Sequence, residues 1–118
     1  DINCDFCVPF SVGVTQTPFG KVVVARTPTK GALRCDLAKI PSDAVVRTMR
    51  SGDVFTKFGG GTKPLNRYLI DKKIPQRNRA KLPLIATGNK VLVVCGVEIS
   101  DEVKITDGKD TIYIFTED

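Results

Sequence analysis

Residues 58–83 form the one part of the chain in which apolar residues follow the period of an α-helix, and this segment most limits the folds available to the sequence. Leu65, Tyr68 and Leu69 recur at the three- and four-residue spacing of a single helix face. Pro75 must end this helix or turn the chain into a second short one, because proline has no backbone N–H for the helical ladder. We therefore expect one or two short helices in the middle of the chain.

Short runs typical of β-strands lie before and after this helical segment, separated by glycine and proline turns. The expected strands cover residues 6–14, 21–26, 32–37, 44–50, 84–86, 90–95, 103–106 and 111–116. The run at 90–95 is almost wholly apolar, so we expect it to be the most buried strand. Residues 107–110 are expected to join the last two strands as a hairpin turn. This order predicts an α+β fold of antiparallel, β-sandwich-like sheets with one or two short helices inserted mid-chain.

Three consecutive glycines precede the helical segment and form a candidate anion site. Thr62 is expected to N-cap the helix, and Pro64 fits its first turn, where a missing N–H would be unpaired anyway. Glycines let backbone N–H groups approach an anion, and a helix N-terminus adds partial positive charge. The predicted phosphate loop consists of Gly59, Gly60, Gly61 and Thr62. A structural turn and a nucleotide-cofactor site are the alternatives, although the Walker A pattern is not matched.

Positive charge is concentrated between residues 47 and 81. This part holds ten cations and two anions, a net charge of +8, while the remaining eight cations and eleven anions give −3. Such asymmetry indicates a polyanionic partner, and a solvated basic surface without a partner is the alternative. Eight of the ten cations are the predicted RNA-binding residues: Arg47, Arg50, Lys63, Arg67, Lys72, Lys73, Arg77 and Arg79.

Two features of this basic part have a structural alternative. Arg47 and Arg50 flank a turn that ends at Asp53, and its carboxylate can pair with one of them in a structural salt bridge. Tyr68 could stack on a base, but its helical phase with Leu65 favours a place in the core.

Length and composition predict one small domain, residues 1–118, with a single core or two subdomains that share one. Because the chain begins with Asp1 rather than Met, we expect it to be part of a longer protein. No apolar run approaches the ~20 residues of a membrane-spanning helix, and no signal-peptide pattern is present. We expect a cytoplasmic protein that makes no membrane contact.

The chain has no histidine and four cysteines, Cys4, Cys7, Cys35 and Cys95. One C-x-x-C without a second pair favours reduced, metal-free thiols, since zinc would require Cys35 and Cys95 to converge on that pair. Without histidine, a general base would have to be Asp, Glu or Lys, and no such constellation is visible. We expect neither catalytic residues nor a cofactor in this chain.

An ordered series of motifs resembles the C-terminal domain of bacterial tRNA(Ile)-lysidine synthetases. In this chain the series is GGGTKPLNRYLIDKKIP, then Arg79 and LPL at 82–84, then VLVVCGVEIS. The family pattern runs GDRF, then G-x-K-K-L-K-x-F-F-I-D-K-K-I-P, then R-x-x-x-P-L, then a strand that ends in glycine. The resemblance covers residues 36–106. Val54 and Pro64 stand where the family often has cations.

This resemblance implies a β-sandwich of unusual topology, similar to a domain of the phenylalanyl-tRNA synthetase β subunit. It also implies a parent ligase that uses ATP, with magnesium, to adenylate the wobble cytidine of tRNA(Ile) and to join lysine to it. The family's catalytic loop, S-G-G-x-D-S, is absent here, so this chain alone is expected to be non-catalytic.

The implied partners are tRNA, near its acceptor stem, and the parent's N-terminal catalytic domain, with a homodimer as a further option. Two other interpretations remain. The chain could be a structural or dimerisation module, marked by an exposed apolar patch. It could also be a small enzyme for a phosphorylated ligand that uses the glycine loop as its anion site.

Overall fold

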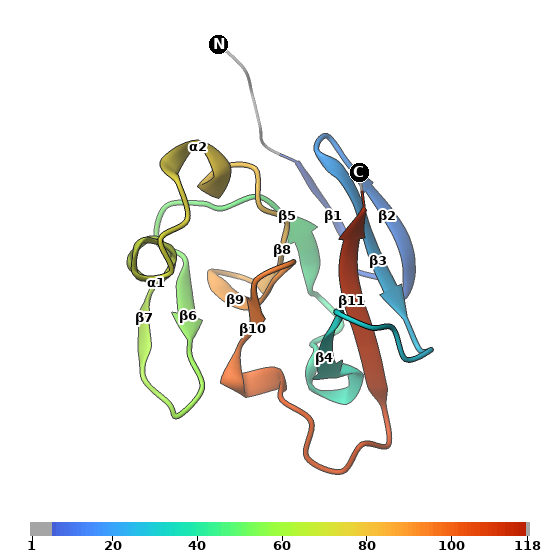
Figure 1. Cartoon of the computed structure of the whole chain (residues 1–118). Helices are drawn as coiled ribbons and strands as arrows, with labels where there is room; N and C mark the ends of the chain where they lie inside the picture. The colour runs from blue at the N-terminus through green and yellow to red at the C-terminus, as the bar shows by residue number, and fades with distance from the viewer. Residues whose placement is uncertain (1–5, 118) are drawn as a thin grey trace.

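Two packed β-sheets form the body of the molecule in the computed structural model, which describes residues 6–117 (Figure 1). The larger sheet has seven strands, in the order β1 (Cys7–Pro9), β5 (Val45–Arg47), β8 (Leu84–Thr87), β9 (Lys90–Val94), β6 (Val54–Thr56) and β7 (Thr62–Pro64), with β10 (Glu98–Ile99) paired to β9. The smaller sheet has four, in the order β2 (Gly13–Thr17), β3 (Gly20–Ala25), β11 (Thr111–Glu117) and β4 (Leu33–Asp36). The predicted α+β, sandwich-like architecture is confirmed, and β6 and β9 form a parallel pair within it.

Two short α-helices, α1 (Leu65–Asp71) and α2 (Gln76–Arg79), lie beside the larger sheet on the side away from the smaller one (Figure 1). The second begins directly after Pro75, so the prediction of one or two helices in mid-chain is confirmed. The short 3-10 helices η1 (Leu37–Lys39) and η2 (Asp101–Val103) complete the fold. No helix within residues 6–117 is long and apolar enough to cross a membrane.

The core between the sheets consists of alternate residues on facing strands. Its members are Val22 and Val24 on β3, Ile112 and Ile114 on β11, and Val46, Ile85 and Val93 on the larger sheet, with further buried neighbours around them. Each of these side chains is at most 2% exposed. Complete burial of a side chain of this size stabilises the fold by about 1.5–3 kcal/mol.

Strand β9 is buried on both of its faces because a hydrophobic core lies against each face of the larger sheet, and a β-bulge interrupts its alternation. Its register with β8 shifts between Ile85 and Ala86. As a result Leu92 and Val93 both face the core between the sheets, whereas Val91 faces the core under α1. The prediction that residues 90–95 hold the most buried strand is confirmed for 91–95.

The second core lies between α1 and the larger sheet. Leu65, Tyr68 and Leu69 are all at most 4% exposed, as the helical spacing predicted. They pack against residues of β6, β8 and β9, and the ring centroids of Phe55 and Tyr68 are 4.4 Å apart at an angle of 40°. Tyr68 is therefore a core residue, which supports the structural interpretation of this side chain.

The hairpin predicted at the C-terminal end is wrong. The part at 103–106 is no strand: η2 ends at Val103, whose side chain is buried, and Ser100 caps η2 by accepting a hydrogen bond from the Glu102 N–H at 3.1 Å. Strand β11 instead pairs with β3 on one edge and β4 on the other. Both edges of β11 are thus occupied, and neither is left for residues 103–106.

Two other expected strands are shorter than predicted. Residues 6–14 divide between β1, which pairs with β5 of the larger sheet, and β2, which pairs with β3 of the smaller one. The strand expected at 44–50 ends at Arg47, because the next residues turn around the carboxylate of Asp53. That carboxylate accepts a hydrogen bond from the Arg50 N–H at 2.8 Å.

The cysteines occupy different surroundings. Cys7 is exposed, whereas burial raises the pKa of both Cys35 and Cys95 to about 12. The two buried thiols are therefore protonated and unreactive at neutral pH. Cys4 lies outside the described residues. Within residues 6–117, no group of three or more His, Cys, Asp or Glu side chains is arranged to hold a metal ion.

Candidate nucleic-acid interface

The three glycines form the turn of a β-hairpin between β6 and β7. Gly59, Gly60 and Gly61 have φ values of 88°, 83° and 97°, a left-handed backbone that favours glycine at each position. Thr62 lies in β7 opposite Thr56, and their hydroxyl oxygens are 2.7 Å apart.

The prediction that this loop opens directly into a helix is wrong. Helix α1 begins one strand later, after Pro64, and no side chain caps its N-terminus. Within the turn, the Gly60 N–H donates to the Lys57 carbonyl at 3.1 Å. The phosphate loop of Gly59 to Thr62 thus lacks the helix N-terminus on which it depended, and the structural-turn alternative is supported.

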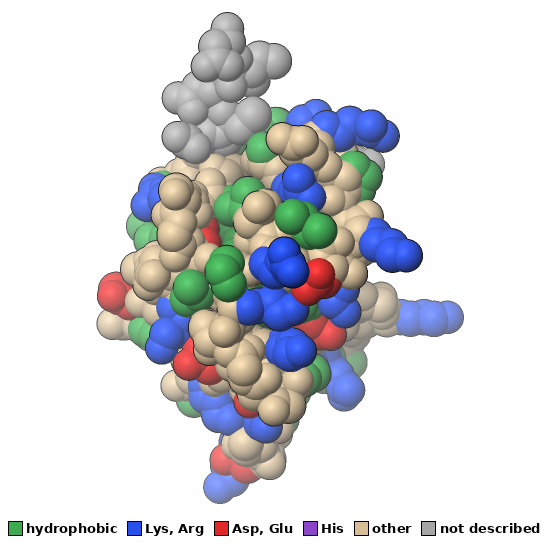
Figure 2. Space-filling view, turned by 90° about the vertical axis from the view of Figure 1, so that its left-hand side faces the viewer, with side chains coloured by type: hydrophobic (Ala, Val, Ile, Leu, Met, Phe, Trp, Pro, Cys, Tyr) green, Lys and Arg blue, Asp and Glu red, His purple; other side chains and the backbone are tan. Residues whose placement is uncertain are grey.

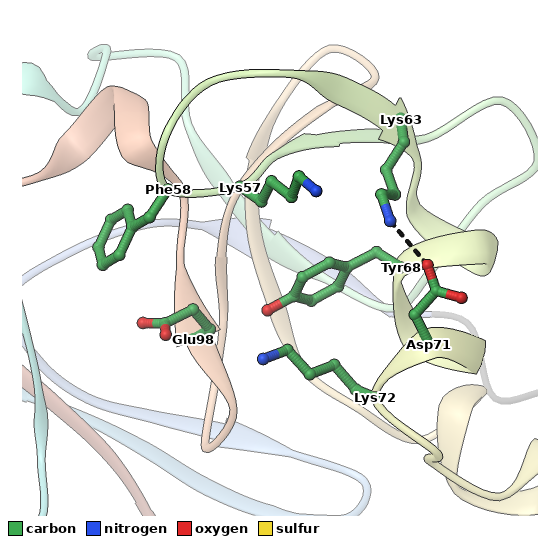
Figure 3. Close-up of a pocket in the computed structure, with 7 residues that line it drawn as sticks. All are labelled: Lys57, Phe58, Lys63, Tyr68, Asp71, Lys72 and Glu98. Atoms are coloured by element: carbon green, nitrogen blue, oxygen red, sulfur yellow. Dashed lines mark hydrogen bonds and ion pairs between the residues drawn. The ribbon is translucent and has the colours of Figure 1, made fainter.

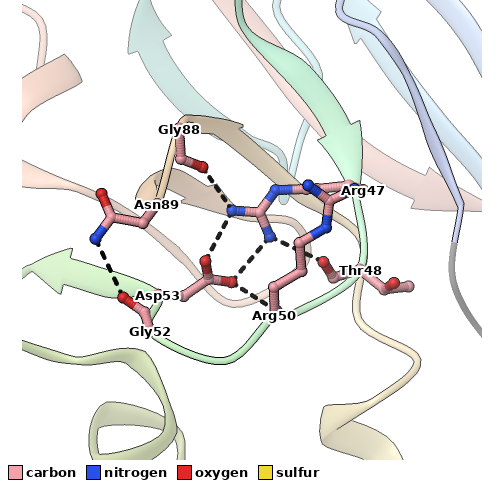
Figure 4. A network of polar contacts seen from close by, with 7 residues as sticks. All are labelled: Arg47, Thr48, Arg50, Gly52, Asp53, Gly88 and Asn89. Carbon is pink, nitrogen blue, oxygen red and sulfur yellow. Dashed lines mark hydrogen bonds and ion pairs between the residues drawn. The ribbon is translucent and has the colours of Figure 1, made fainter.

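The Arg47 guanidinium is buried inside the protein, and both of its terminal nitrogens are hydrogen-bonded, whereas its Nε has no partner within residues 6–117 (Figure 4). Its two terminal nitrogens donate to the two carboxylate oxygens of Asp53 at 2.9 and 2.8 Å. They also donate to the carbonyls of Thr48 and Gly88, both at 2.9 Å. The Arg47 side chain is only 1% exposed, so its prediction as an RNA-binding residue is wrong and the structural salt bridge is correct. Arg50 uses only its backbone N–H in this network and remains exposed.

Asp71, the other acid of the basic part, also has a partner. Its carboxylate accepts a hydrogen bond from the Lys63 ammonium at 2.7 Å. This hydrogen bond holds the pKa of Asp71 below its usual value. Lys63 joins this acid from β7, next to the glycine turn, and its side chain is 26% exposed. Lys63 is therefore partly neutralised before any ligand arrives.

The other basic residues between 47 and 81 have no ion-pair partner in the part of the chain that the structure describes. They are Arg50, Lys57, Arg67, Lys72, Lys73, Arg77, Arg79 and Lys81. All of them are exposed except Arg79, which is half-buried. Lys and Arg side chains gather across the middle and right of the face that carries β7, α1 and α2 (Figure 2).

The turn that follows α1 fixes the direction of Lys72 and Lys73, the two lysines directly after the helix. Lys73 has a φ of 61°, and its N–H donates to the Ile70 carbonyl at 2.8 Å. The Ile74 N–H donates to the Leu69 carbonyl at 3.1 Å. This pair of bonds is a Schellman motif with lysine at the position that glycine usually occupies. The turn buries part of Ile74 against the second core and leaves Lys72 and Lys73 in solvent.

Arg79 has a structural task as well as a charge. One terminal nitrogen donates to the Ile74 carbonyl at 3.3 Å, which joins α2 to the end of α1. Its Nε atom is buried and has no hydrogen-bond partner within residues 6–117. We therefore expect Arg79 to contribute less than Arg67 or Arg77 to any contact with an external anion.

A cleft of about 440 Å³ lies between the β6–β7 hairpin, α1 and β10 (Figure 3). It is lined by Lys57, Phe58, Lys63, Tyr68, Asp71, Lys72 and Glu98. The Lys72 ammonium lies 5.6 Å from the centre of the Tyr68 ring, within the range of a cation–π contact. Burial and the nearby Glu98 carboxylate raise the pKa of the Tyr68 hydroxyl.

Sequence reasoning missed Lys57, Phe58 and Glu98 as possible site residues. A large aromatic residue directly before three glycines was the available signal for Phe58, because a glycine turn offers little apolar surface to cover a ring. No local signal marked Glu98, which reaches the cleft only because β10 pairs with β9.

Comparison with known proteins places this chain in a protein family. The model of the family described as "TilS substrate C-terminal domain" matches residues 44–114. The chain is 34% identical over 80 residues to a tRNA(Ile)-lysidine synthase of Caldanaerobacter subterraneus, with 67% of this chain and 17% of that protein covered. It is 40% identical over 73 residues to the same enzyme of Persephonella marina, with 60% and 16% covered.

A solved structure is also similar along almost its whole length. The crystal structure of a TilS C-terminal domain superimposes with a TM-score of 0.75 at 26% identity and covers 96% of each chain. This structural match includes the strands before residue 44, which the family model leaves out.

Proposed function

The chain belongs to the family of TilS substrate C-terminal domains, and from this membership we propose that it is the tRNA-binding domain of a cytoplasmic tRNA(Ile)-lysidine synthetase. The parent enzyme would ligate lysine to the wobble cytidine of tRNA(Ile), with ATP and magnesium bound by its N-terminal catalytic domain. The chain spans only 16–17% of the length of the relatives compared here, which leaves room for that domain. This chain would hold the tRNA near its acceptor stem.

One observation carries the proposal: both acids of the basic part are already used. Asp53 pairs with Arg47 and Asp71 pairs with Lys63, so eight cations remain without an acidic partner within residues 6–117. Duplex RNA is recognised mainly through its shape and its phosphates, and such recognition depends on cations more than on base-specific groups. An external polyanion would supply the missing negative charge.

The proposed contact surface follows the two helices and their junction. It consists of Arg67, Lys72, Lys73 and Arg77, with Arg50, Lys63, Arg79 and Lys81 at its margins. Its members come from one continuous part of the chain, and the second core under α1 holds that part in place. The surface therefore needs no rearrangement before it meets an RNA backbone.

The exposed apolar residues favour a second, compatible role for the smaller sheet. Val12 and Val14 are 44% and 60% exposed. Val14 of β2 lies opposite Val23 of β3, and Val23 lies opposite Phe115 of β11. This row on the outer face of the smaller sheet suits contact with another part of the parent enzyme or with a second copy of the chain. It lies on a different element from the basic surface, so the two roles do not compete.

The first prediction tests RNA binding by fluorescence anisotropy of labelled tRNA, titrated with the chain over a series of salt concentrations. If four to six phosphates are neutralised, log K should fall with log salt with a slope of roughly −3 to −5. Replacing Lys72 and Lys73 together by Ala should lower that slope by about one to two for any duplex sequence.

The matched control is the double variant Lys30→Ala with Lys109→Ala, which removes two exposed lysines from other loops. It should leave the slope unchanged. A salt-independent affinity, or an equal loss in both double variants, would contradict the proposed surface. Absence of binding at low salt would favour the structural role of the outer apolar row instead.

A further inference from the structure

The cleft beside α1 continues into a second hollow on the far side of Phe58. This second hollow has a volume of about 350 Å³ and is lined by Ala32, Leu33, Arg34, Phe58, Glu98, Ile99, Lys104 and Ile105. Phe58 and Glu98 line both hollows. The two together make one groove, here named the Phe58 groove, which runs from α1 across the β6–β7 hairpin to β4 and the residues that follow η2.

Phe58 lies at the middle of this groove and takes no part in either core. Its side chain is 49% exposed, whereas Phe55, three residues earlier, is completely buried. Phe58 belongs to neither group of packed apolar residues. The glycines that follow carry no side chains that could cover the ring. The exposed Phe58 ring offers a π face in a polar groove, and a flat ring such as a nucleobase can stack on such a face.

The groove has positive charge on both sides of this ring. Lys57 and Lys72 line the first hollow, and Arg34 lines the second; none of them has an ion-pair partner in the described part of the chain. Figure 3 shows Lys72 and the Tyr68 hydroxyl extending into the space between Glu98 and the Lys63–Asp71 pair. A ligand that fits this pattern is flat at its centre and anionic at both ends.

Glu98 adds a further requirement. One of its carboxylate oxygens accepts a hydrogen bond from the Ile99 N–H at 3.0 Å, which orients the group beside Phe58. An ionised carboxylate only accepts hydrogen bonds, so a ligand that carries donors complements it. Inorganic phosphate has no ring to place on Phe58. A nucleotide within a strand has a base, ribose or amino donors, and a phosphate on each side.

We propose that the Phe58 groove holds one unpaired nucleotide of an RNA strand, with its base stacked on Phe58 and its flanking phosphates near Lys57 and Lys72 on one side and Arg34 on the other. This inference rests on the proposed RNA-binding function and extends it. The helices hold the duplex by its backbone, and the groove receives a nucleotide that leaves the duplex. Stacking on an aromatic ring tolerates any base, so the groove recognises the unpaired state rather than the sequence.

The test compares a blunt RNA duplex with the same duplex carrying a short unpaired 3′ or 5′ extension labelled with 2-aminopurine. The chain should bind an extended duplex more tightly than the blunt one and should quench the 2-aminopurine fluorescence. Phe58→Ala should weaken binding of the extended duplex by about five- to a hundred-fold, abolish the quenching and leave the blunt duplex unaffected. Phe58→Tyr should restore both readouts, since it keeps the ring.

Ile70→Ala is the matched control, because Ile70 is 46% exposed on α1 and does not line the groove. It should change neither readout. Arg34→Ala should lower the salt slope by about 0.7 for the extended duplex alone. Equal binding of blunt and extended duplexes, or equal losses on both in Phe58→Ala, would overturn the Phe58 groove. Failure to bind even the blunt duplex at low salt would instead count against the proposed function.

Discussion

The basic part of the chain places similar cations in two opposite surroundings. Around Asp53, Arg47 is 1% exposed and makes four hydrogen bonds to one carboxylate and two carbonyls. Along α1 and α2, Lys72 and Arg77 lie in solvent and have no acidic partner within residues 6–117. The first region uses positive charge to join two turns of the larger sheet, and the second leaves it available.

The difference shows that the position of the acids decides what a cation can do. A charge can be buried only when it is paired and hydrogen-bonded, and Asp53 lies six residues from Arg47 across a tight turn. The helical part has a single acid, Asp71, and this acid already forms an ion pair with Lys63. A count of charges treats both regions alike, whereas the pairing separates the structural arginine from the cations that an RNA could reach.

The largest expected effect comes from breaking the buried pair. Arg47→Ala leaves the Asp53 carboxylate buried without its partner, and we expect the free energy of unfolding to fall by about 3–5 kcal/mol. Urea unfolding followed by circular dichroism measures this loss. Arg50→Ala is the matched control, because its exposed side chain takes no part in the network and should change stability by less than about 0.5 kcal/mol.

The double variant Arg47→Met with Asp53→Leu sharpens this prediction. It removes both charges and should regain part of the stability, because no unpaired charge is left buried. The recovery should be incomplete, because the Arg50 N–H and the Gly88 carbonyl lose their hydrogen bonds to this pair. If Arg47→Ala instead left stability unchanged and weakened tRNA binding, the division between a structural and an available region would be wrong.

A smaller effect is expected where the two regions meet, at the Lys63–Asp71 pair. Asp71→Asn releases Lys63 toward the solvent and should tighten tRNA binding by up to about fivefold at moderate salt, roughly the contribution of one phosphate contact. Anisotropy titrations of the variant and of Asp107→Asn, a change in a loop outside the basic part, measure this gain. Unchanged or weaker binding in Asp71→Asn would show that Lys63 does not reach the RNA.

The same pair has a defined pH dependence. The pKa of Asp71 is lowered in the folded protein, mainly by its hydrogen bond to Lys63, so the pair stabilises the fold at every pH above the ordinary pKa of an aspartate. That contribution is lost as the pH falls further, through the lowered pKa. Between pH 5 and pH 8 the pair should therefore add no pH dependence to stability, and Asp71→Asn should behave in parallel with the unchanged chain across this window.

Local spacing was enough to predict much of the fold. The face of Leu65, Tyr68 and Leu69, the buried strand at 90–95 and the helix after Pro75 all follow from patterns within a few residues. The hairpin expected at 103–116 failed because pairing between distant strands decided it: β11 finds both partners more than seventy residues earlier in the chain. No pattern within 103–116 contains that information.

The site was predictable only in part for the same reason. Composition located the basic part and its cations, but the glycine triplet suits a helix N-terminus and a hairpin turn equally well, and the pairing of β6 with β7 selects the hairpin. The burial of Arg47 depends on Gly88, which comes from a turn forty-one residues later. The groove around Phe58 requires β10 and β4, which no local pattern connects to the glycine turn.

The smallest expected effect concerns Lys73, just after α1. Two variants of this residue separate the contribution of the lysine charge to RNA binding from the contribution of the backbone conformation to stability. Lys73 occupies the left-handed position of a Schellman motif, where a side chain costs conformational energy and glycine does not. Lys73→Gly should therefore raise the free energy of unfolding by roughly 0.5–1 kcal/mol, while Lys73→Ala, which keeps a Cβ, should not. Both variants remove the same charge, so tRNA binding should weaken equally in each. Thermal unfolding and anisotropy, measured on the same two proteins, separate the backbone contribution from the charge contribution. A loss of binding in Lys73→Gly alone would mean that the fixed direction of the turn, rather than the lysine charge, determines the contact with RNA.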